Sequence, residues 1–285
     1  MPNLFTEDTY EQAIIELFEN MGYDHLYAPD FDRDYTSPIL DSILRDSLVR
    51  INRGLPVEAI DEAMSKLKNF DTGSLLQKNM IFMDYLQNGV TIKFFVKGEE
   101  QSSIVRLIDY QNVKSNSFYV VNQLTFLENG NNRRPDIILF INGLPLVLME
   151  LKSPAKDEVG VENAYHQIRN YMQDIPSIFY YNAICVISDL STNKAGTITS
   201  GLDRFMEWKT KDGNYEDTAY ASFETFYEGM FQKERLLDIL KNFILFSGVS
   251  NSRFKVLAGY HQYFAVRKAI EKAKVATKTD GKGGV

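Results

Sequence analysis

Cysteine, histidine and tryptophan are scarce in this chain, with one, three and one residues among 285. A single thiol, Cys185, cannot form a disulfide within the chain, which excludes a disulfide-stapled domain and fits a reducing compartment. His25 and His166 have no carboxylate or cysteine at metal-ligand spacing, which favours ordinary polar roles over a zinc site.

Long apolar runs are also missing. The longest hold about five residues, as at 137–141, whereas a transmembrane helix needs about 20. Residues 1–5 lack the charged and apolar regions of a signal peptide. We therefore expect a cytoplasmic protein with no membrane partner.

No uniform basic charge marks the chain as a nucleic-acid clamp. The net charge is −7, yet the segment from Asn251 onward holds eight Lys or Arg and two Asp or Glu, a local +6. The rest therefore carries −13, which argues against a free-standing DNA-binding protein of high affinity. If DNA is the substrate, we expect a partner to deliver it.

What the sequence does contain is an alternation of helical and strand patterns. Apolar residues recur at helical spacing from Tyr10 to Met21, and Gly22 follows as a stop. A helical stretch over 40–86 is broken near residues 54–56 and 71–73. The other patterns predict strands over 90–96, 103–108, 118–127, 136–141, 144–152 and 183–187, and helices over 159–173, 226–246 and 260–276. This order predicts an α/β fold with a mixed sheet flanked by helices.

Charged residues stand at the ends of two neighbouring apolar strands. Asp136 opens the first strand, and Glu150 and Lys152 close the second on one face. Two such carboxylates can hold Mg²⁺, which lowers the pKa of a bound water and neutralises charge on a phosphate. Lys152 can add a cation beside that phosphate or orient the water. The alternative is that Asp136 caps a turn and that Glu150 and Lys152 form a surface pair.

The loop between these strands decides whether the acids can meet. A two-residue loop at Asn142-Gly143 would place them on opposite faces of the sheet. A three-residue loop beginning at Ile141 would put Asp136 opposite Leu148, with Glu150 as its diagonal neighbour. The metal-site interpretation therefore predicts the longer loop.

Gln167 and Tyr171 lie four residues apart on the helix predicted after Lys152, so they share one face. Together with Asp136 and the pair Glu150-x-Lys152, they resemble the nuclease core of the PD-(D/E)xK superfamily. More closely, the chain resembles the N-terminal nuclease region of the restriction (R) subunit of type I restriction-modification enzymes. The resemblance spans the whole chain and also rests on residues 7–23, 132–136, 148–154, 259–266 and 280–285.

The resemblance implies roles for the site residues. Asp136 and Glu150, with the Leu151 carbonyl, would hold Mg²⁺, and Lys152 would be the catalytic lysine. Gln167 and Tyr171 would form the accessory motif that positions the active site or its DNA. An acid of the first helix would complete the site. Glu7 and Glu11 compete for that role, and we favour Glu11 because it flanks the apolar stripe, whereas the helix dipole alone explains Glu7.

The resemblance also divides the chain. Residues 1–247 would form the endonuclease domain, with a helical insertion at about 38–87, and residues 248–285 would be a linker and the start of a helicase-like motor. Gln262 looks like part of the adenine-reading segment of that motor. No phosphate-binding G-x-x-x-x-G-K-[ST] loop is present in the sequence. We therefore expect a fragment that does not hydrolyse ATP by itself.

The implied function is that of a type I site-specific deoxyribonuclease, which hydrolyses DNA phosphodiester bonds with Mg²⁺. In the full-length protein, cleavage would be coupled to ATP-driven translocation. The expected partners are double-stranded DNA and the methyltransferase and specificity subunits. Two alternatives remain: a stand-alone repair nuclease of the same superfamily, and a non-catalytic docking module for a methyltransferase core.

Overall fold

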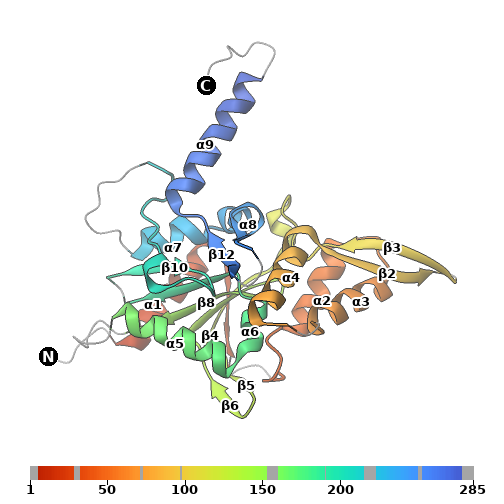
Figure 1. Ribbon diagram of the computed structural model, residues 1–285, viewed down its shortest axis with the longest axis horizontal. Helices are drawn as coiled ribbons and strands as arrows, with labels where there is room; N and C mark the ends of the chain where they lie inside the picture. The colour runs from red at the N-terminus through yellow and green to blue at the C-terminus, as the bar shows by residue number, and fades with distance from the viewer. Residues whose placement is uncertain are drawn as a thin grey trace.

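A computed structural model of the protein describes residues 6–28, 33–70, 73–96, 98–152, 160–189, 191–214, 223–249 and 252–277. Its centre is a six-stranded sheet in the order β1-β4-β7-β8-β9-β10 (Figure 1). These strands span Asp24–Tyr27, Phe118–Asn122, Ile137–Ile141, Leu144–Leu151, Ile184–Ser188 and Asn193–Gly196. The pairs β1–β4 and β8–β9 are parallel and the others are antiparallel, so the predicted mixed sheet is confirmed.

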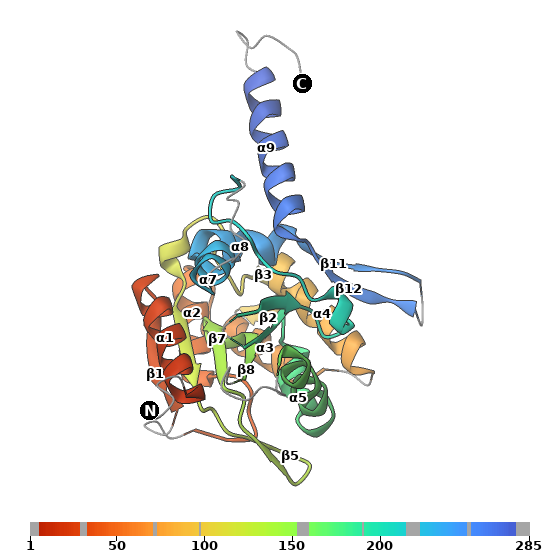
Figure 2. The ribbon, with the colours of Figure 1, turned by 90° about the vertical axis from the view of Figure 1, so that its left-hand side faces the viewer.

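Both faces of this sheet are covered. Every residue of β7, β8 and β9 is buried, which explains why these strands read as continuous apolar runs. Helices α1 (Glu7–Asn20), α7 (Phe223–Phe231) and α8 (Lys233–Asn242) pack on one face, and α5 (Val161–Asp174) and α6 (Pro176–Tyr180) pack on the other. Figure 2 shows α1 and α5 on opposite sides of β7 and β8.

The helical stretch predicted over 40–86 consists of three helices: α2 (Asp41–Ile51), α3 (Val57–Lys68) and α4 (Leu75–Asn88). The breaks fall where the sequence predicts them. The hairpin of β2 (Val90–Val96) and β3 (Glu99–Val105) follows and projects from the body (Figure 1). The division into an endonuclease domain with an insertion and a motor lead-in stays a prediction.

The remaining elements are η2 (Val113–Ser115), β5 (Phe126–Glu128), β6 (Asn131–Arg133), η3 (Leu202–Arg204), β11 (Ile244–Ser247), β12 (Phe254–Leu257) and α9 (Tyr260–Ala276). Helix α9 extends away from the body in both views (Figures 1 and 2). No described helix is both long and apolar enough to cross a membrane.

Two predicted elements are shorter than expected. The helical pattern over 226–246 ends at Asn242, and Ile244–Ser247 instead pairs as a strand with β12. The strand predicted over 118–127 breaks after Asn122, because Gln123 has a φ of 57° and turns the chain out of the sheet. That break begins the segment that leads to Asp136.

Candidate active site

The turn between β7 and β8 has two residues, so the predicted three-residue loop is wrong. Asn142 and Gly143 have φ values of 54° and 81°, as a type I′ hairpin turn requires. Ile141 pairs directly with Leu144. The left-handed conformation of Asn142 is held by its side chain, whose Nδ2 donates to the Leu107 carbonyl at 2.9 Å. The tight turn is therefore held by hydrogen bonds to the segment 107–117, which is distant in sequence.

A β-bulge restores the register that the site needs. Strand β8 holds one extra residue, Leu146, opposite the step from Leu139 to Phe140. The bulge shifts every later pair by one residue, and continuing the pairing brings Asp136, directly before β7, opposite Glu150. The two acids thus share a face despite the short loop.

Backbone groups and a lysine fix the acid pair. The Leu151 N–H donates to Asp136 Oδ2 at 2.7 Å, and Lys152 Nζ donates to Glu150 Oε1 at 2.7 Å. The Lys152 N–H donates to the Ser188 carbonyl at 2.8 Å, at the end of the neighbouring strand β9. The side chain of Glu150 is 2% exposed and that of Lys152 is 16% exposed. The alternative of a surface pair is therefore wrong.

Burial and mutual repulsion shift the protonation of the acids. Burial, followed by the charge of Asp136, raises the pKa of Glu150 well above its ordinary value. Burial also raises the pKa of Asp136, and the charges of Glu7 and Glu11 add to the rise. Burial opposes the charge on Lys152, but Glu150 and Asp136 outweigh it and raise the pKa of that lysine. The two acids therefore hold their protons more tightly than exposed carboxyl groups do, while Lys152 keeps its positive charge.

The donor set fits a hard divalent cation. Within the described part of the chain, Glu150 Oε2 is buried without a hydrogen bond of normal geometry, although the Tyr171 hydroxyl interacts with the Glu150 carboxyl group. A carboxylate oxygen in that position is stabilised by an oxygen-preferring cation such as Mg²⁺. No three His, Cys, Asp or Glu side chains converge on a metal position among the described residues. A metal here would therefore have two carboxylates and keep several waters, as Mg²⁺ usually does.

Helix α1 brings two further acids near Asp136. Glu11 is buried, and its Oε1 and Oε2 accept from Asn122 Nδ2 and Gln123 Nε2, each at 2.7 Å. Glu7 lies one turn earlier and is exposed. The charges of both acids raise the pKa of Asp136, so both lie within electrostatic reach of it. The choice of Glu11 stays a prediction.

Helix α5 brings the accessory pair to the same carboxylate. Gln167 Nε2 donates to the Tyr171 hydroxyl at 3.0 Å, and Tyr171 is buried. Burial, and then the Glu150 charge, raise the pKa of Tyr171. Tyr171 thus lies beside Glu150, and Gln167 orients its hydroxyl.

Gln262 lies apart from these residues, on the first turn of α9. Its Oε1 accepts from the Gly259 N–H at 2.9 Å and so caps the helix. It also lines a pocket of about 500 Å³ between β12, α9 and the segment around η3. None of the acids above lines that pocket.

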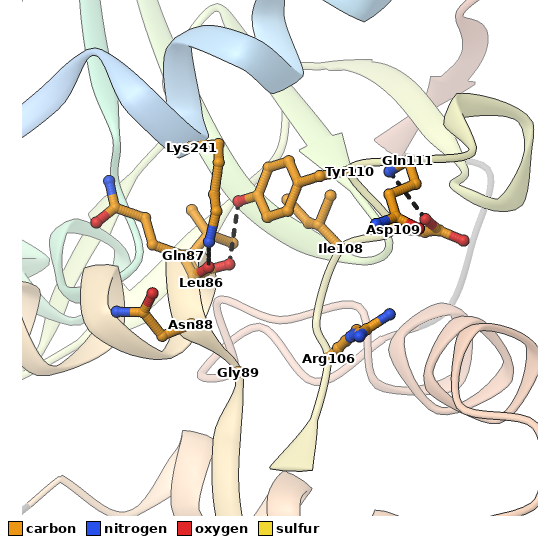
Figure 3. Close-up of a pocket in the computed structure, with 10 residues that line it drawn as sticks. All are labelled: Leu86, Gln87, Asn88, Gly89, Arg106, Ile108, Asp109, Tyr110, Gln111 and Lys241. Carbon is orange, nitrogen blue, oxygen red and sulfur yellow. Dashed lines mark hydrogen bonds between the residues drawn. The ribbon is translucent and has the colours of Figure 1, made fainter.

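A second pocket, of about 290 Å³, lies between the end of α4, the segment 106–111 and Lys241 of α8 (Figure 3). Its polar groups are engaged in holding the helix end. The Tyr110 hydroxyl donates to the Leu86 carbonyl at 3.0 Å, and Lys241 Nζ donates to the Gln87 carbonyl. It contains none of the candidate site residues. We therefore assign this pocket a structural role, as the place where these elements meet.

Three residues that support the acids did not stand out in the sequence. Asn122 and Gln123 hold both oxygens of Glu11, and the Ser188 carbonyl holds the backbone of Lys152. The sequence offers one clue, because two amide side chains directly follow the apolar run 118–121. Ser188 offers none, since its contribution comes from the backbone.

Comparison with known proteins identifies the family of the chain. Residues 4–204 match the family described as the type I restriction enzyme R protein N terminus. The HindI endonuclease subunit of Haemophilus influenzae is 31% identical over 291 residues, which cover 98% of this chain and 28% of that protein. The putative MjaIXP endonuclease subunit of Methanocaldococcus jannaschii is 31% identical over 288 residues, covering 92% and 27%.

A third relative, the EcoprrI endonuclease subunit of Escherichia coli, is 27% identical over 284 residues, covering 94% of this chain and 82% of that protein. The chain thus spans between a quarter and a third of the length of the first two relatives. The match over residues 4–204 covers most of the chain and includes Asp136, Glu150, Lys152 and the accessory pair. The chain therefore belongs to the type I restriction enzyme R protein family, whose N-terminal region it represents.

Proposed function

We propose that this chain is the nuclease part of a type I restriction endonuclease subunit and that it hydrolyses DNA phosphodiester bonds with Mg²⁺. The observation that carries the proposal is that Asp136, bonded to the Leu151 N–H, lies beside Glu150 at the ends of β7 and β8, with Lys152 bonded to Glu150. The relatives of this chain are named as endonuclease subunits, which supports the same activity.

Each residue of the candidate site has its own proposed role. Asp136, Glu150 and the Leu151 carbonyl would hold Mg²⁺, which, when bound, lowers the pKa of a water and neutralises charge on the phosphate. Lys152 keeps its proton beside the acids and places a cation next to the attacked phosphoryl group or orients the water. The Leu151 N–H fixes one oxygen of Asp136, and the other oxygen would bind the metal.

Two flanking elements support the reaction. Glu11, held by two amides, adds a further acid behind Asp136 and shapes the charge of the site. Tyr171 and Gln167 lie over Glu150 from α5 and orient that carboxylate or the DNA beside it.

The full-length subunit would couple cleavage to ATP-driven DNA translocation and work in the cytoplasm with methyltransferase and specificity subunits. Gln262 would contribute to nucleotide binding in that setting. The acidic charge of residues 1–250 supports this arrangement, because such a surface needs partners to bring DNA to it.

Plasmid cleavage by the complete subunit, assembled with its partner subunits, tests the proposal. Asp136→Ala removes one of two metal-binding carboxylates, and we expect cleavage to fall at least about a hundredfold, as losing a catalytic group does. Chelation of Mg²⁺ should abolish cleavage by the parent. The control Glu100→Ala removes an acid of β3 whose side chain is 52% exposed and should cleave at the parental rate.

The same experiment separates the alternatives. Cleavage without ATP or partner subunits would identify a stand-alone repair nuclease. Equal cleavage by the parent and Asp136→Ala would remove this site from the chemistry. Assembly without any cleavage by the parent would identify a docking module.

A further inference from the structure

The hairpin of β5 and β6 is attached directly to the candidate site. Strand β6 ends at Arg133, three residues before Asp136, and β5 begins three residues after Gln123. In both views the hairpin projects from the body beyond the end of the central sheet (Figures 1 and 2). Asn129 and Gly130 close it with φ values of 51° and 80°, so its turn is tight.

One face of the hairpin is bound to α5 and α6. Glu128 Oε2 accepts from the Ser177 N–H at 3.0 Å, at the start of α6. Asn131 Nδ2 donates to the Asp174 carbonyl at 3.2 Å, and Arg133 Nε donates to Asp174 Oδ2 at 2.7 Å. These contacts use the polar groups of that face and fix the hairpin to the helix that carries Tyr171.

The segment 33–37 braces the base of the hairpin. The guanidinium of Arg33 lies 4.7 Å from the ring centre of Phe126 and donates to the Thr125 carbonyl at 2.5 Å. The Leu127 N–H donates to the Tyr35 carbonyl at 2.9 Å. The hairpin is thus an ordered projection held at its base and along one face.

The other face has a different composition. Leu127 pairs with Asn132 on this face. Arg134 is the first residue after β6, and continuing the alternation of side chains by one residue assigns it to the same face. All three are exposed, as is Asn129 in the turn. This outer face, defined by these four residues, has one guanidinium, two amides, one apolar side chain and no carboxylate.

The two neighbouring arginines differ in their pairing. Arg133 is neutralised by Asp174, whereas Arg134 has no ion pair or side-chain hydrogen bond among the residues that the structure describes. The Cα atoms of Arg134 and Asp136 are at most about 7 Å apart. Their side chains can therefore contact neighbouring phosphates of one DNA strand.

We propose that the outer face of the β5–β6 hairpin enters a groove of double-stranded DNA, with Arg134 on a phosphate next to the one that is cleaved. The proposal rests on the nuclease function proposed above. A two-stranded ribbon fits the major groove, and arginine is well suited to phosphate oxygens. Asn129 and Asn132 offer amides to base edges, and the missing carboxylates avoid repulsion in a chain of net charge −7.

A matched pair of substitutions tests the proposal. The complete subunit is titrated with a duplex of about 30 base pairs, without ATP, at several salt concentrations, for Arg134→Gln and Arg133→Gln. Both lose one charge from adjacent positions, but on opposite faces of the hairpin. We expect Arg134→Gln to weaken binding roughly five- to thirtyfold and to reduce the salt slope by about one. Arg133→Gln should bind within about twofold of the parent.

Further measurements make each outcome decisive. Arg134→Lys keeps the charge and should restore the salt slope. Thermal unfolding of both Arg134 variants should match that of the parent. Parental binding by Arg134→Gln, or an equal loss in Arg133→Gln, would overturn the proposal. The proposed nuclease function is tested separately, by comparing DNA cleavage by the parent with cleavage by Asp136→Ala. If the parent subunit does not bind duplex DNA at all, the groove contact proposed here is overturned, whereas the nuclease proposal is still decided by cleavage in the complete assembly.

Discussion

At the residue scale, the candidate site is a small set of groups whose charges do not cancel. Glu150 offers one oxygen to Lys152 and keeps the other buried without a hydrogen bond of normal geometry. A buried ion pair of this kind contributes little net stability, because desolvation offsets most of the attraction. Its retention in an otherwise apolar sheet is therefore better explained by chemistry than by folding.

Lys152→Ala should abolish DNA cleavage by the full assembly while leaving ATP hydrolysis largely intact. The lysine acts on the phosphate, whereas the proposed motor chemistry lies outside residues 1–247. Plasmid cleavage and ATP hydrolysis are measured side by side, with parent and variant assembled with the same subunits. Cleavage at the parental rate would exclude Lys152 from the mechanism, and joint loss of both activities would indicate damaged folding or docking.

At the element scale, the turn and the bulge of the β7–β8 hairpin work together. A two-residue turn matches the twist of the strands, but alone it would separate the acids. The extra residue Leu146 corrects this. The turn is also packed against α2, since a Cβ at Gly143 would lie 2.6 Å from the Leu40 carbonyl oxygen and 2.7 Å from the Leu44 nitrogen.

Gly143→Ala should therefore destabilise the protein strongly. Gly130 gives a matched control, because its φ of 80° nearly equals the 81° of Gly143, yet nothing lies within 4 Å of a Cβ there. We expect Gly130→Ala to cost about 1 kcal/mol, from its left-handed conformation alone, and Gly143→Ala to cost several times as much. Urea unfolding measures both, and equal losses would show that the contact with α2 does not matter.

The β7–β8 hairpin also shows how much of the candidate site could be predicted from the sequence. The apolar runs predicted the two strands and that they are neighbours. The charged residues predicted which side chains lie at the strand ends. The bulge could not be predicted, because every residue of β8 is apolar up to Met149 and no alternation marks Leu146 as the extra one. The break at Gln123 was missed for a similar reason, since nothing in its residue type requires a positive φ.

At the scale of the whole molecule, one buried lysine joins three parts of the chain. Lys255 of β12 is 2% exposed, and its Nζ donates to Asn79 Oδ1 of α4 at 3.0 Å and to the Asn182 carbonyl, before β9, at 2.7 Å. The Asn79 side chain also donates to the carbonyls of Phe179 and Tyr180. The helices of 38–87, the central sheet and the C-terminal strand are thus held at one point.

Lys255 should make the stability of the protein depend on pH. Burial lowers its pKa to about 7 from 10.5, so between these values the unfolded chain binds the proton more tightly. Stability then rises with pH over that window and is lowest below about pH 7. Relative to Lys255→Met, the parent should gain on the order of 3 kcal/mol from pH 7 to 9.5. Urea unfolding of both proteins checks this, and parallel curves would contradict it.

The burial of Cys185 has a practical consequence. This thiol is the only one in the chain and lies on β9 with no exposed surface, and burial raises its pKa to about 12. Alkylating reagents need an accessible thiolate. The rate at which such a reagent modifies this chain therefore reports how often the central sheet opens, without any engineered probe.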